Sequence, residues 1–177
     1  MRITIRKANN YDVDELEQLY DNLNDYLERT INYPGWIKGT YPTRKEAVNG
    51  INEGCLYVAI YNENIVGSFI LRHEPEPAYQ GAKWQSELSY ENVYVIYTFA
   101  VHPSYLGQGV GQEIIQFIIE HSIKANVKSI RLDVYERNLP AIKLYEKCGF
   151  NYVGTVDLGL EYYGLKWFKL YELIISE

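Results

Sequence analysis

The alternation of hydrophobic and polar residues predicts strands at several places along the chain. Residues 2–7 alternate isoleucines with polar residues, and residues 129–135 show the same period of two. A period of two places one set of side chains on a single face, so both segments predict half-buried strands. Apolar runs at 56–61 and 65–72 flank a short polar turn and predict a hairpin. Further strands are predicted at 93–101, 150–156 and 166–175.

Hydrophobic residues at helical spacing predict two helices in the first third of the chain. In residues 13–28 leucines recur every three or four positions, and Asp12 with the glutamate three residues later has the pattern of a capping box. Thr43 and Glu46 form a second such pattern, before a helix that we expect to end at Gly54.

Two more helices are predicted in the second half. Residues 110–126 carry isoleucines on a wide apolar face, which together with the length of the segment favours a buried helix over a strand. Asn138 is placed as an N-cap, Pro140 stands in the first turn, and Gly149 follows the end of a short helix. The resulting order, β-α-α-β-β-β-α-β-α-β-β, predicts a mixed α/β protein around one central sheet.

Two irregular segments separate these elements. Residues 29–42 hold prolines, glycines and large aromatic residues, and residues 73–92 are too irregular for one element and long for a plain connection. Loops with these features commonly build binding sites. We therefore expect both segments to bound a ligand site, with 73–92 as a candidate lid.

Composition narrows the class of protein. The 177 residues fit one domain, 1–177, and 47% hydrophobic with 23% charged residues is typical of a globular chain. A net charge of −6 argues against nucleic acid or an anionic membrane as partner, because both bind basic patches, and it suits a cationic substrate.

Cysteine spacing and hydropathy add two further expectations. Cys55 and Cys148 are the only cysteines, and their separation predicts free, buried thiols and no metal site. The first residues form no apolar signal segment, and no run approaches the roughly 20 apolar residues that cross a bilayer. We expect a cytoplasmic chain.

A glycine-rich stretch connects the strand at 93–101 to the helix at 110–126. Gly107, Gly109 and Gly111 stand at alternate positions. Glycines remove Cβ from a turn, so several backbone N–H groups can converge on an anion, and a helix N-terminus adds about half a positive charge. The stretch therefore predicts a pyrophosphate site, the plain alternative being a tight strand-to-helix connection.

The spacing separates three kinds of glycine loop. A P-loop is excluded because no Lys-Ser or Lys-Thr follows Gly111. A dinucleotide fingerprint fits poorly, because the pattern is G-x-G-x-G and five residues separate it from the strand. The stretch resembles instead the coenzyme A loop of the GNAT superfamily of N-acetyltransferases, [RQ]-x-x-G-x-[GA] after a strand that ends in V-x-P.

This resemblance rests on Val101, Pro103, Gly109 and Gly111, whereas Leu106 stands where the family has Arg or Gln. The resemblance implies that the residue at this position contributes mainly its backbone N–H, so we expect the site to survive the change. It also implies acetyl-coenzyme A as co-substrate, without a metal, held by Leu106, Gly107, Gln108, Gly109, Val110 and Gly111.

Residues 138–150 resemble a second family signature, N-x-x-A-x-x-L-Y-x-x-x-G-F, in the expected order after the glycine loop. Taken alone, this segment is also a capped amphipathic helix. With both motifs the resemblance covers residues 2–175. It implies a single-domain α/β fold with a central, mixed, mostly antiparallel, twisted sheet of about seven strands, flanked by about four helices.

The chemistry of acetyl transfer assigns roles to these residues. An amine that attacks a thioester must lose a proton, and the departing thiolate must gain one. A phenol with a pKa near 10 can supply that proton, and the resemblance places Tyr145 beside the thioester sulfur as the general acid. It also implies that Asn138 contacts coenzyme A and that the pantetheine arm pairs with Phe99, Ala100 and Val101 like an added strand.

The general base is less constrained by the sequence. The strand at 93–101 contains no internal acid, so Glu91 and Asp133 are candidates for a base that acts through water. The alternative for each is a solvated surface charge.

We therefore expect an N-acetyltransferase that moves an acetyl group from acetyl-coenzyme A to a primary amine of a small molecule or a peptide, by direct attack in a ternary complex. A homodimer is compatible with this role. The alternative is a domain that binds or senses acyl-coenzyme A with weak or no turnover; retention of Tyr145 argues against it, and the missing obvious base argues for it.

Overall fold

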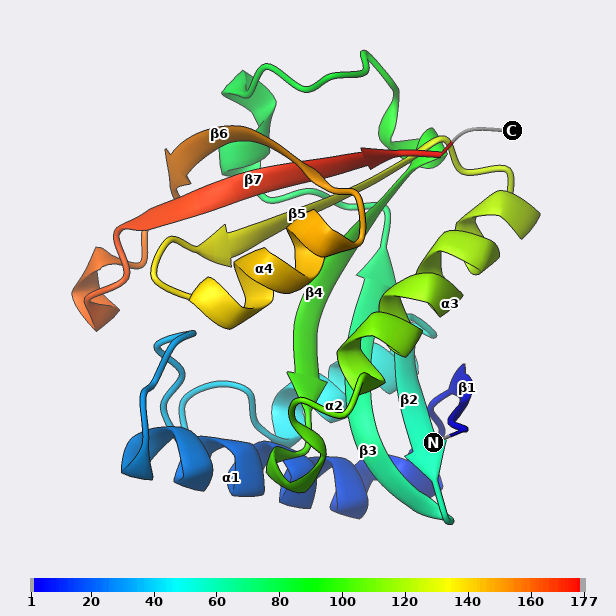
Figure 1. Ribbon diagram of the computed structural model, residues 1–177, viewed down its shortest axis with the longest axis vertical. Coiled ribbons are helices and arrows are strands. Elements are labelled where there is room, and N and C mark those ends of the chain that lie inside the picture. The colour runs from blue at the N-terminus through cyan, green and yellow to red at the C-terminus, as the bar shows by residue number, and fades with distance from the viewer. Residues whose placement is uncertain (1, 176–177) are drawn as a thin grey trace. The chain divides into compact units, whose positions relative to one another are not determined.

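The computed structural model describes residues 2–175 and contains a seven-stranded mixed sheet in the order β1-β2-β3-β4-β5-β7-β6 (Figure 1). The strands are β1 (Thr4–Lys7), β2 (Leu56–Tyr61), β3 (Asn64–Arg72), β4 (Val93–Val101), β5 (Ser129–Tyr135), β6 (Asn151–Asp157) and β7 (Trp167–Ile174). The helices are α1 (Val13–Arg29), α2 (Arg44–Asn52), α3 (Val110–Lys124) and α4 (Leu139–Lys147). The predicted fold class and element order are confirmed.

The chain packs as two compact units. The first contains the residues up to 32, 36–71 and 97–114, and the second contains 33–35, 72–96 and the residues from 115 on. The predicted domain range 1–177 includes residues 1, 176 and 177, which lie outside the described part of the chain, and it stays a prediction.

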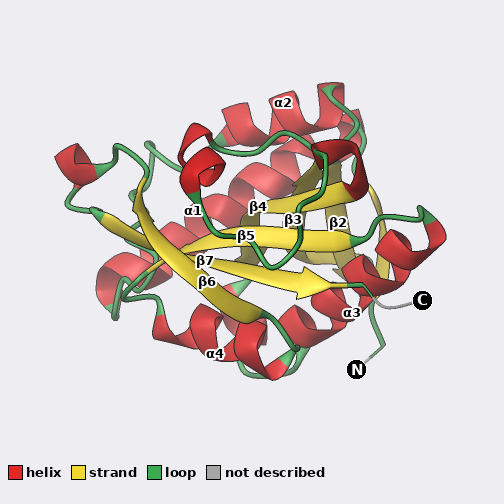
Figure 2. Ribbon diagram, turned by 90° about the horizontal axis from the view of Figure 1, so that it is seen from above, coloured by secondary structure: helices red, strands yellow, loops and turns green. Residues whose placement is uncertain are grey.

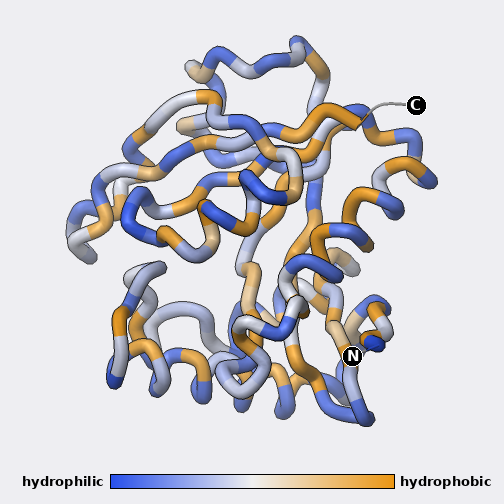
Figure 3. The backbone as a smooth tube through the Cα atoms, in the orientation of Figure 1, coloured by the Kyte–Doolittle hydropathy of each residue, from blue (hydrophilic) through white to orange (hydrophobic). Residues whose placement is uncertain are grey.

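The first unit is built from antiparallel strands and an amphipathic helix. β1 pairs with β2 and β2 with β3, and the hairpin turns at Asn62 and Glu63, whose φ angles of 48° and 66° are left-handed. Hydrophobic residues recur between hydrophilic ones along α1 (Figure 3). The buried face of this helix contributes to the core of the unit. The core cluster contains Leu16, Leu19, Tyr20, Leu23, Leu27, Ala47, Cys55, Leu56, Val58, Ile65, Ile70 and Ala100.

The start of α1 differs from the prediction. Asp12 stands at the N-cap position of α1 as predicted, but its side chain makes no capping hydrogen bond, and Asn9 caps the short 3-10 turn that precedes the helix. Asp12 forms an ion pair with Arg6 at 2.7 Å, and Glu15 accepts a hydrogen bond from the backbone N–H of Ile65 at 2.6 Å. The capping box predicted at Asp12 is therefore wrong, because both carboxylates bind partners outside the helix. The box at Thr43 and Glu46 is confirmed.

The second unit is centred on β5, which pairs antiparallel with β7 along its whole length and parallel with the start of β4. β6 pairs with the other edge of β7. Figure 2 shows α4 on one face of β5 and β7 and the connection between β3 and β4 on the other. Asn138 caps α4 as predicted, accepting from the N–H of Ala141 at 3.4 Å, and Gly149 ends it with φ of 94°.

One cysteine and one irregular segment differ from what the sequence predicts. Cys55 is buried as expected, but Cys148 is half-buried, because it stands at the last turn of α4. The irregular segment 73–92 contains the 3-10 helices η2 (Pro77–Gly81) and η3 (Tyr90–Asn92). Among residues 2–175, no helix is both long and apolar enough to cross a membrane.

Candidate active site

The glycine loop, residues 106–111, lies in the first unit between β4 and α3. Gly107 and Gly109 have φ angles of 73° and 88°. Residues that carry a Cβ rarely adopt this left-handed backbone conformation. No heavy atom lies within 4 Å of the place where a Cβ would stand on either glycine, so the space beside them is open. The loop thus leaves open space beside its backbone, and the pyrophosphate site stays a prediction.

The first turn of α3 supplies donors to this space. The carbonyl of Gly109 accepts from the N–H of Glu113 at 3.0 Å, which makes Gly109 the residue that precedes the helix. The first N–H groups of a helix have no partner inside it, and a glycine in the capping position has no side chain that could accept from them. These N–H groups can bind an anion. Leu106, which stands where the family has Arg or Gln, is 43% exposed. Its side chain is therefore not part of the core.

β4 carries an irregularity that the sequence does not announce. Thr98 has φ of 48° in the middle of the strand, and its hydroxyl lies 2.5 Å from that of Tyr41. Residues in sparsely populated backbone conformations persist only where the surrounding structure enforces them, and they cluster at active sites. No pattern rule predicts a left-handed threonine, because its branched Cβ disfavours this conformation. Phe99, Ala100 and Val101 follow Thr98 directly.

Two neighbours fix this part of β4. A Cβ on Gly67 of β3 would meet the carbonyl oxygen of Ala100 at 3.1 Å and the Ile114 side chain at 3.0 Å, so close approach of the strands requires glycine there. Tyr41 is tied to α1, because the Asn24 amide donates to its carbonyl at 3.3 Å. The loop at 29–42 therefore contributes Tyr41 beside β4, a residue that sequence reasoning did not single out.

Tyr145 lies in the second unit, on α4, and is 5% exposed. Its ring packs on Phe150, 5.7 Å between centroids. Burial, reinforced by the charge of Asp133 and by Cys148, raises the pKa of Tyr145 above its ordinary value. The phenol therefore keeps its proton at neutral pH, which is the state that a general acid needs.

Asp133, on β5, is the titratable group that couples to Tyr145. Its Oδ2 atom accepts a hydrogen bond from the Tyr79 hydroxyl at 2.6 Å. Burial raises the pKa of Asp133 to about 6, with a further contribution from Glu76 and against the effect of the Tyr79 hydrogen bond. A carboxylate with a pKa close to neutrality is well matched to proton transfer. Two predicted residues, Asp133 and Tyr145, therefore interact electrostatically.

Glu91 has a different setting. It is exposed in η3 and accepts a hydrogen bond from the Ser89 hydroxyl at 3.1 Å. Tyr79, by contrast, is 1% exposed and reaches Asp133, although it comes from the irregular segment at 73–92. The sequence offered no signal for this contact beyond the abundance of aromatic residues there.

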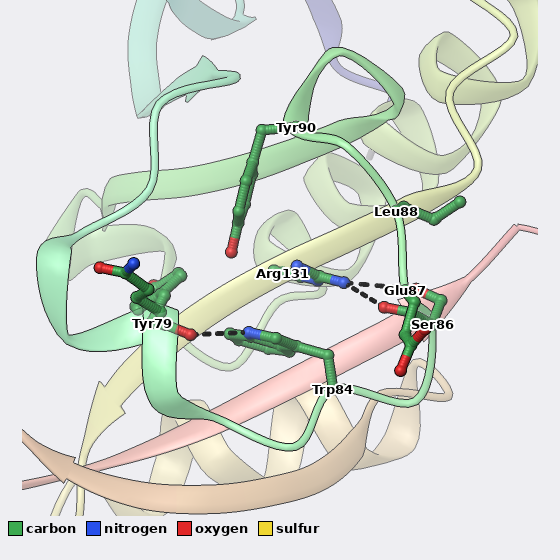
Figure 4. Close-up of a pocket in the computed structure, with 8 residues that line it drawn as sticks. Tyr79, Trp84, Ser86, Glu87, Leu88, Tyr90 and Arg131 are labelled. Carbon is green, nitrogen blue, oxygen red and sulfur yellow. Dashed lines mark hydrogen bonds between the residues drawn. The ribbon is translucent and has the colours of Figure 1, made fainter.

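A pocket of about 330 Å³ lies over β5 on the face that the segment 73–92 covers (Figure 4). Trp84 and Tyr90 flank the Arg131 guanidinium, whose carbon lies 4.3 Å and 5.1 Å from their ring centroids. The Arg131 Nε donates to Glu172 at 3.0 Å, and both residues are at least 98% buried. The pocket lining is Tyr79, Gln80, Trp84, Ser86, Glu87, Leu88, Tyr90 and Arg131.

Glu172 is held ionised by its neighbours. Burial alone would raise the pKa of Glu172, but hydrogen bonds from Ser86, Ser129 and Arg131 outweigh this effect and keep the pKa below its ordinary value. The backbone N–H of Gln85 adds a further bond at 2.6 Å. The segment 73–92 is therefore fastened to β5 and β7 by a buried ion pair.

The sequence model of the acetyltransferase (GNAT) family matches residues 16–150. The chain belongs to this family. Among curated relatives, streptothricin acetyltransferase of Escherichia coli is 28% identical over 120 residues, 66% of this chain and 60% of that protein. Spermine/spermidine N(1)-acetyltransferase of Bacillus subtilis (strain 168) is 33% identical over 64 residues, 36% of this chain and 42% of that protein.

A third relative, [ribosomal protein bS18]-alanine N-acetyltransferase of Escherichia coli (strain K12), is 38% identical over 56 residues, 32% of this chain and 38% of that protein. The chain thus spans less than two thirds of each of these three relatives.

Solved structures agree on the fold of this GNAT chain. The GNAT family acetyltransferase from Streptococcus agalactiae 2603 superposes with a TM-score of 0.79 at 19% identity, covering 99% of this chain and 96% of that one. The Salmonella typhimurium protein yncA, solved with its cofactor acetyl-CoA, gives a TM-score of 0.70 at 16% identity, covering 99% and 95%.

Proposed function

We propose that this GNAT chain transfers an acetyl group from acetyl-coenzyme A to a primary amine of a small molecule or peptide, by direct attack in a ternary complex. The observation that carries the proposal is the pair Asp133 and Tyr145, a carboxylate with a pKa of about 6 close to a buried, protonated phenol. The names of two relatives support an amine acceptor, since one is named for acetylating spermine and spermidine and the other for acetylating an alanine.

The glycine loop is the proposed site for the pyrophosphate of acetyl-coenzyme A. Its open space, its two left-handed glycines and the unpaired N–H groups at the start of α3 fit an anion of that size. We assign the binding to the backbone of Leu106, Gly107, Gln108, Gly109, Val110 and Gly111. The pantetheine arm would extend along Phe99, Ala100 and Val101, which follow the left-handed Thr98. Asn138 and Tyr145 are the proposed contacts on α4.

The two side chains of the acid–base pair have distinct roles. Asp133 accepts the proton of the attacking ammonium or amine through water, because its pKa leaves it mostly ionised at pH 7. Tyr145 holds the proton that the departing thiolate takes up, because its pKa is raised by burial. The thioester oxygen is stabilised by a backbone N–H near Val101. We place the base on Asp133 and not on Glu91, which is exposed to solvent.

A panel of amines with acetyl-coenzyme A, with release of free thiol as readout, tests this proposal. It should include a polyamine and a peptide with a free N-terminus. We expect turnover with at least one amine, a loss of about 10²- to 10⁴-fold in Asp133→Asn, and little change in the matched variant Glu91→Gln. Binding of acetyl-coenzyme A by calorimetry, with no thiol release from any amine, would favour the binding or sensing alternative.

A further inference from the structure

Tyr79 is the direct hydrogen-bond partner of the proposed base. Its hydroxyl donates to Asp133 Oδ2 at 2.6 Å, a short contact that is typical of an O–H donor on an ionised acceptor. Tyr79 is 1% exposed, so bulk water does not compete for this bond. Rotation of the carboxylate away from Tyr79 would cost Asp133 a charge-assisted hydrogen bond.

The position of Tyr79 is itself fixed by the buried network of the second unit. The Trp84 indole N–H donates to the main-chain oxygen of Tyr79 at 3.0 Å, and the two rings lie 5.2 Å apart (Figure 4). Trp84 in turn stacks on Arg131, which is paired with Glu172 of β7. This chain of contacts runs from the sheet to the hydroxyl that reaches Asp133.

We propose that Tyr79 is a positioning residue for acetyl transfer, whose hydroxyl orients the Asp133 carboxylate and stabilises its ionised form. Tyr79 touches neither the amine nor the thioester in this role and acts through Asp133. The inference rests on the proposed function, since it takes Asp133 as the base. It assigns a catalytic purpose to the segment 73–92, which otherwise only covers β5.

The electrostatic setting defines what the hydroxyl contributes. Burial and the charge of Glu76 both favour the neutral form of Asp133, whereas the Tyr79 hydrogen bond favours the charged form. Tyr145 also faces this charge, and its own ionisation is disfavoured by it. Without the Tyr79 hydroxyl, burial and the charge of Glu76 act on Asp133 unopposed. Asp133 would then be protonated over a larger part of the range near pH 7 and would be a weaker catalyst there.

The test is Tyr79→Phe, which deletes one oxygen atom and keeps the ring. We expect the acidic limb of kcat/KM to move up by about one pH unit, so that kcat/KM falls about twofold at pH 7 and nearly tenfold at about pH 5. The KM for acetyl-coenzyme A should stay unchanged. Tyr171→Phe is the matched control, because Tyr171 is also 1% exposed and its hydroxyl donates to another carboxylate, Glu146, at 2.9 Å.

A second measurement separates this inference from the proposed function. NMR of carboxyl-¹³C-labelled aspartate reports the titration of Asp133 without any amine, with Asp133→Asn identifying the signal. An unchanged titration midpoint in folded Tyr79→Phe would overturn the inference even if the enzyme is active. A raised midpoint with an unshifted pH–rate profile would also overturn it, because Asp133 would then not limit the reaction. Should Tyr79→Phe not fold, Trp84→Phe, which removes the indole donor to Tyr79, should raise the midpoint by a smaller amount, and no rise there would reject the proposal.

Discussion

At the scale of single residues, the arrangement of Asp133 and Tyr145 separates two protonation states. Tyr145 is buried and Asp133 half-buried, and desolvation raises the pKa of each. The same physical effect has opposite consequences, because a carboxyl with a pKa near 6 is still mostly charged at pH 7 while the phenol is fully protonated. One environment therefore supplies a base and an acid.

Tyr145→Phe tests the acid. The change removes only the hydroxyl, so the ring can still pack on Phe150 and α4 should keep its place. We expect kcat to fall by about 10²- to 10⁴-fold while the Kd for acetyl-coenzyme A stays near the wild-type value. Rapid-quench kinetics should accompany the steady-state assay. Wild-type turnover in this variant, with chemistry as the slow step, would mean that another group protonates the thiolate.

Asp133→Asn tests the cost of keeping the base ionised. The folded pKa of about 6 lies above the ordinary value of 3.8, so the native state loses stability relative to the unfolded chain as pH rises between these values. The neutral amide avoids this loss and can still accept from Tyr79. We expect the variant to be more stable at pH 7 by roughly 1–3 kcal/mol and equally stable below pH 4, as urea denaturation would measure. Equal stability at both pH values would contradict the raised pKa.

At the scale of elements, patterns within the sequence predicted the strands and helices, because hydrophobic period and caps are local properties. The first residues of β4, β5 and α3 are those predicted from the sequence. The contacts of Tyr79 and Thr98 escaped prediction for a physical reason. Tyr79 meets a residue 54 positions away, and Thr98 adopts a conformation that its own side chain disfavours. Long-range contacts and strain leave no periodic trace.

Gly109→Asp tests the glycine loop. Aspartate is a good helix N-cap, so α3 should form, but the residue must tolerate φ of 88° and its charge would stand in the proposed anion site. We expect loss of measurable acetyl-coenzyme A binding by calorimetry with a cooperative thermal unfolding transition retained. Gly109→Ala is the control, since it imposes the backbone strain without the charge, and it should weaken binding less. Unchanged affinity in folded Gly109→Asp would remove the loop from the binding site.

At the scale of the whole molecule, the proposed roles divide between the two units. The first unit carries the glycine loop and the left-handed Thr98, while the second carries Asp133, Tyr145 and the network around Arg131. Both β4 and α3 begin in one unit and end in the other, so the chain passes between them inside regular elements. The stability of the second unit depends on its buried charges, because an ion pair inside a core is stable only while both partners remain.

Glu172→Gln tests this dependence. The change leaves the Arg131 charge buried without its counter-ion, so we expect the free energy of unfolding at pH 7 to fall by about 3–5 kcal/mol, a large part of the total for a typical domain. Because the pKa of Glu172 is held below its ordinary value, its contribution exists above that value and is lost as pH falls through the folded pKa. The difference between wild type and variant in urea denaturation should therefore shrink in acid.

Glu146→Gln, which alters an exposed carboxylate bound to Tyr171, should change stability by less than about 1 kcal/mol. If Glu172→Gln is as stable as wild type at pH 7, water reaches Arg131 and the network does not hold the segment 73–92 over β5.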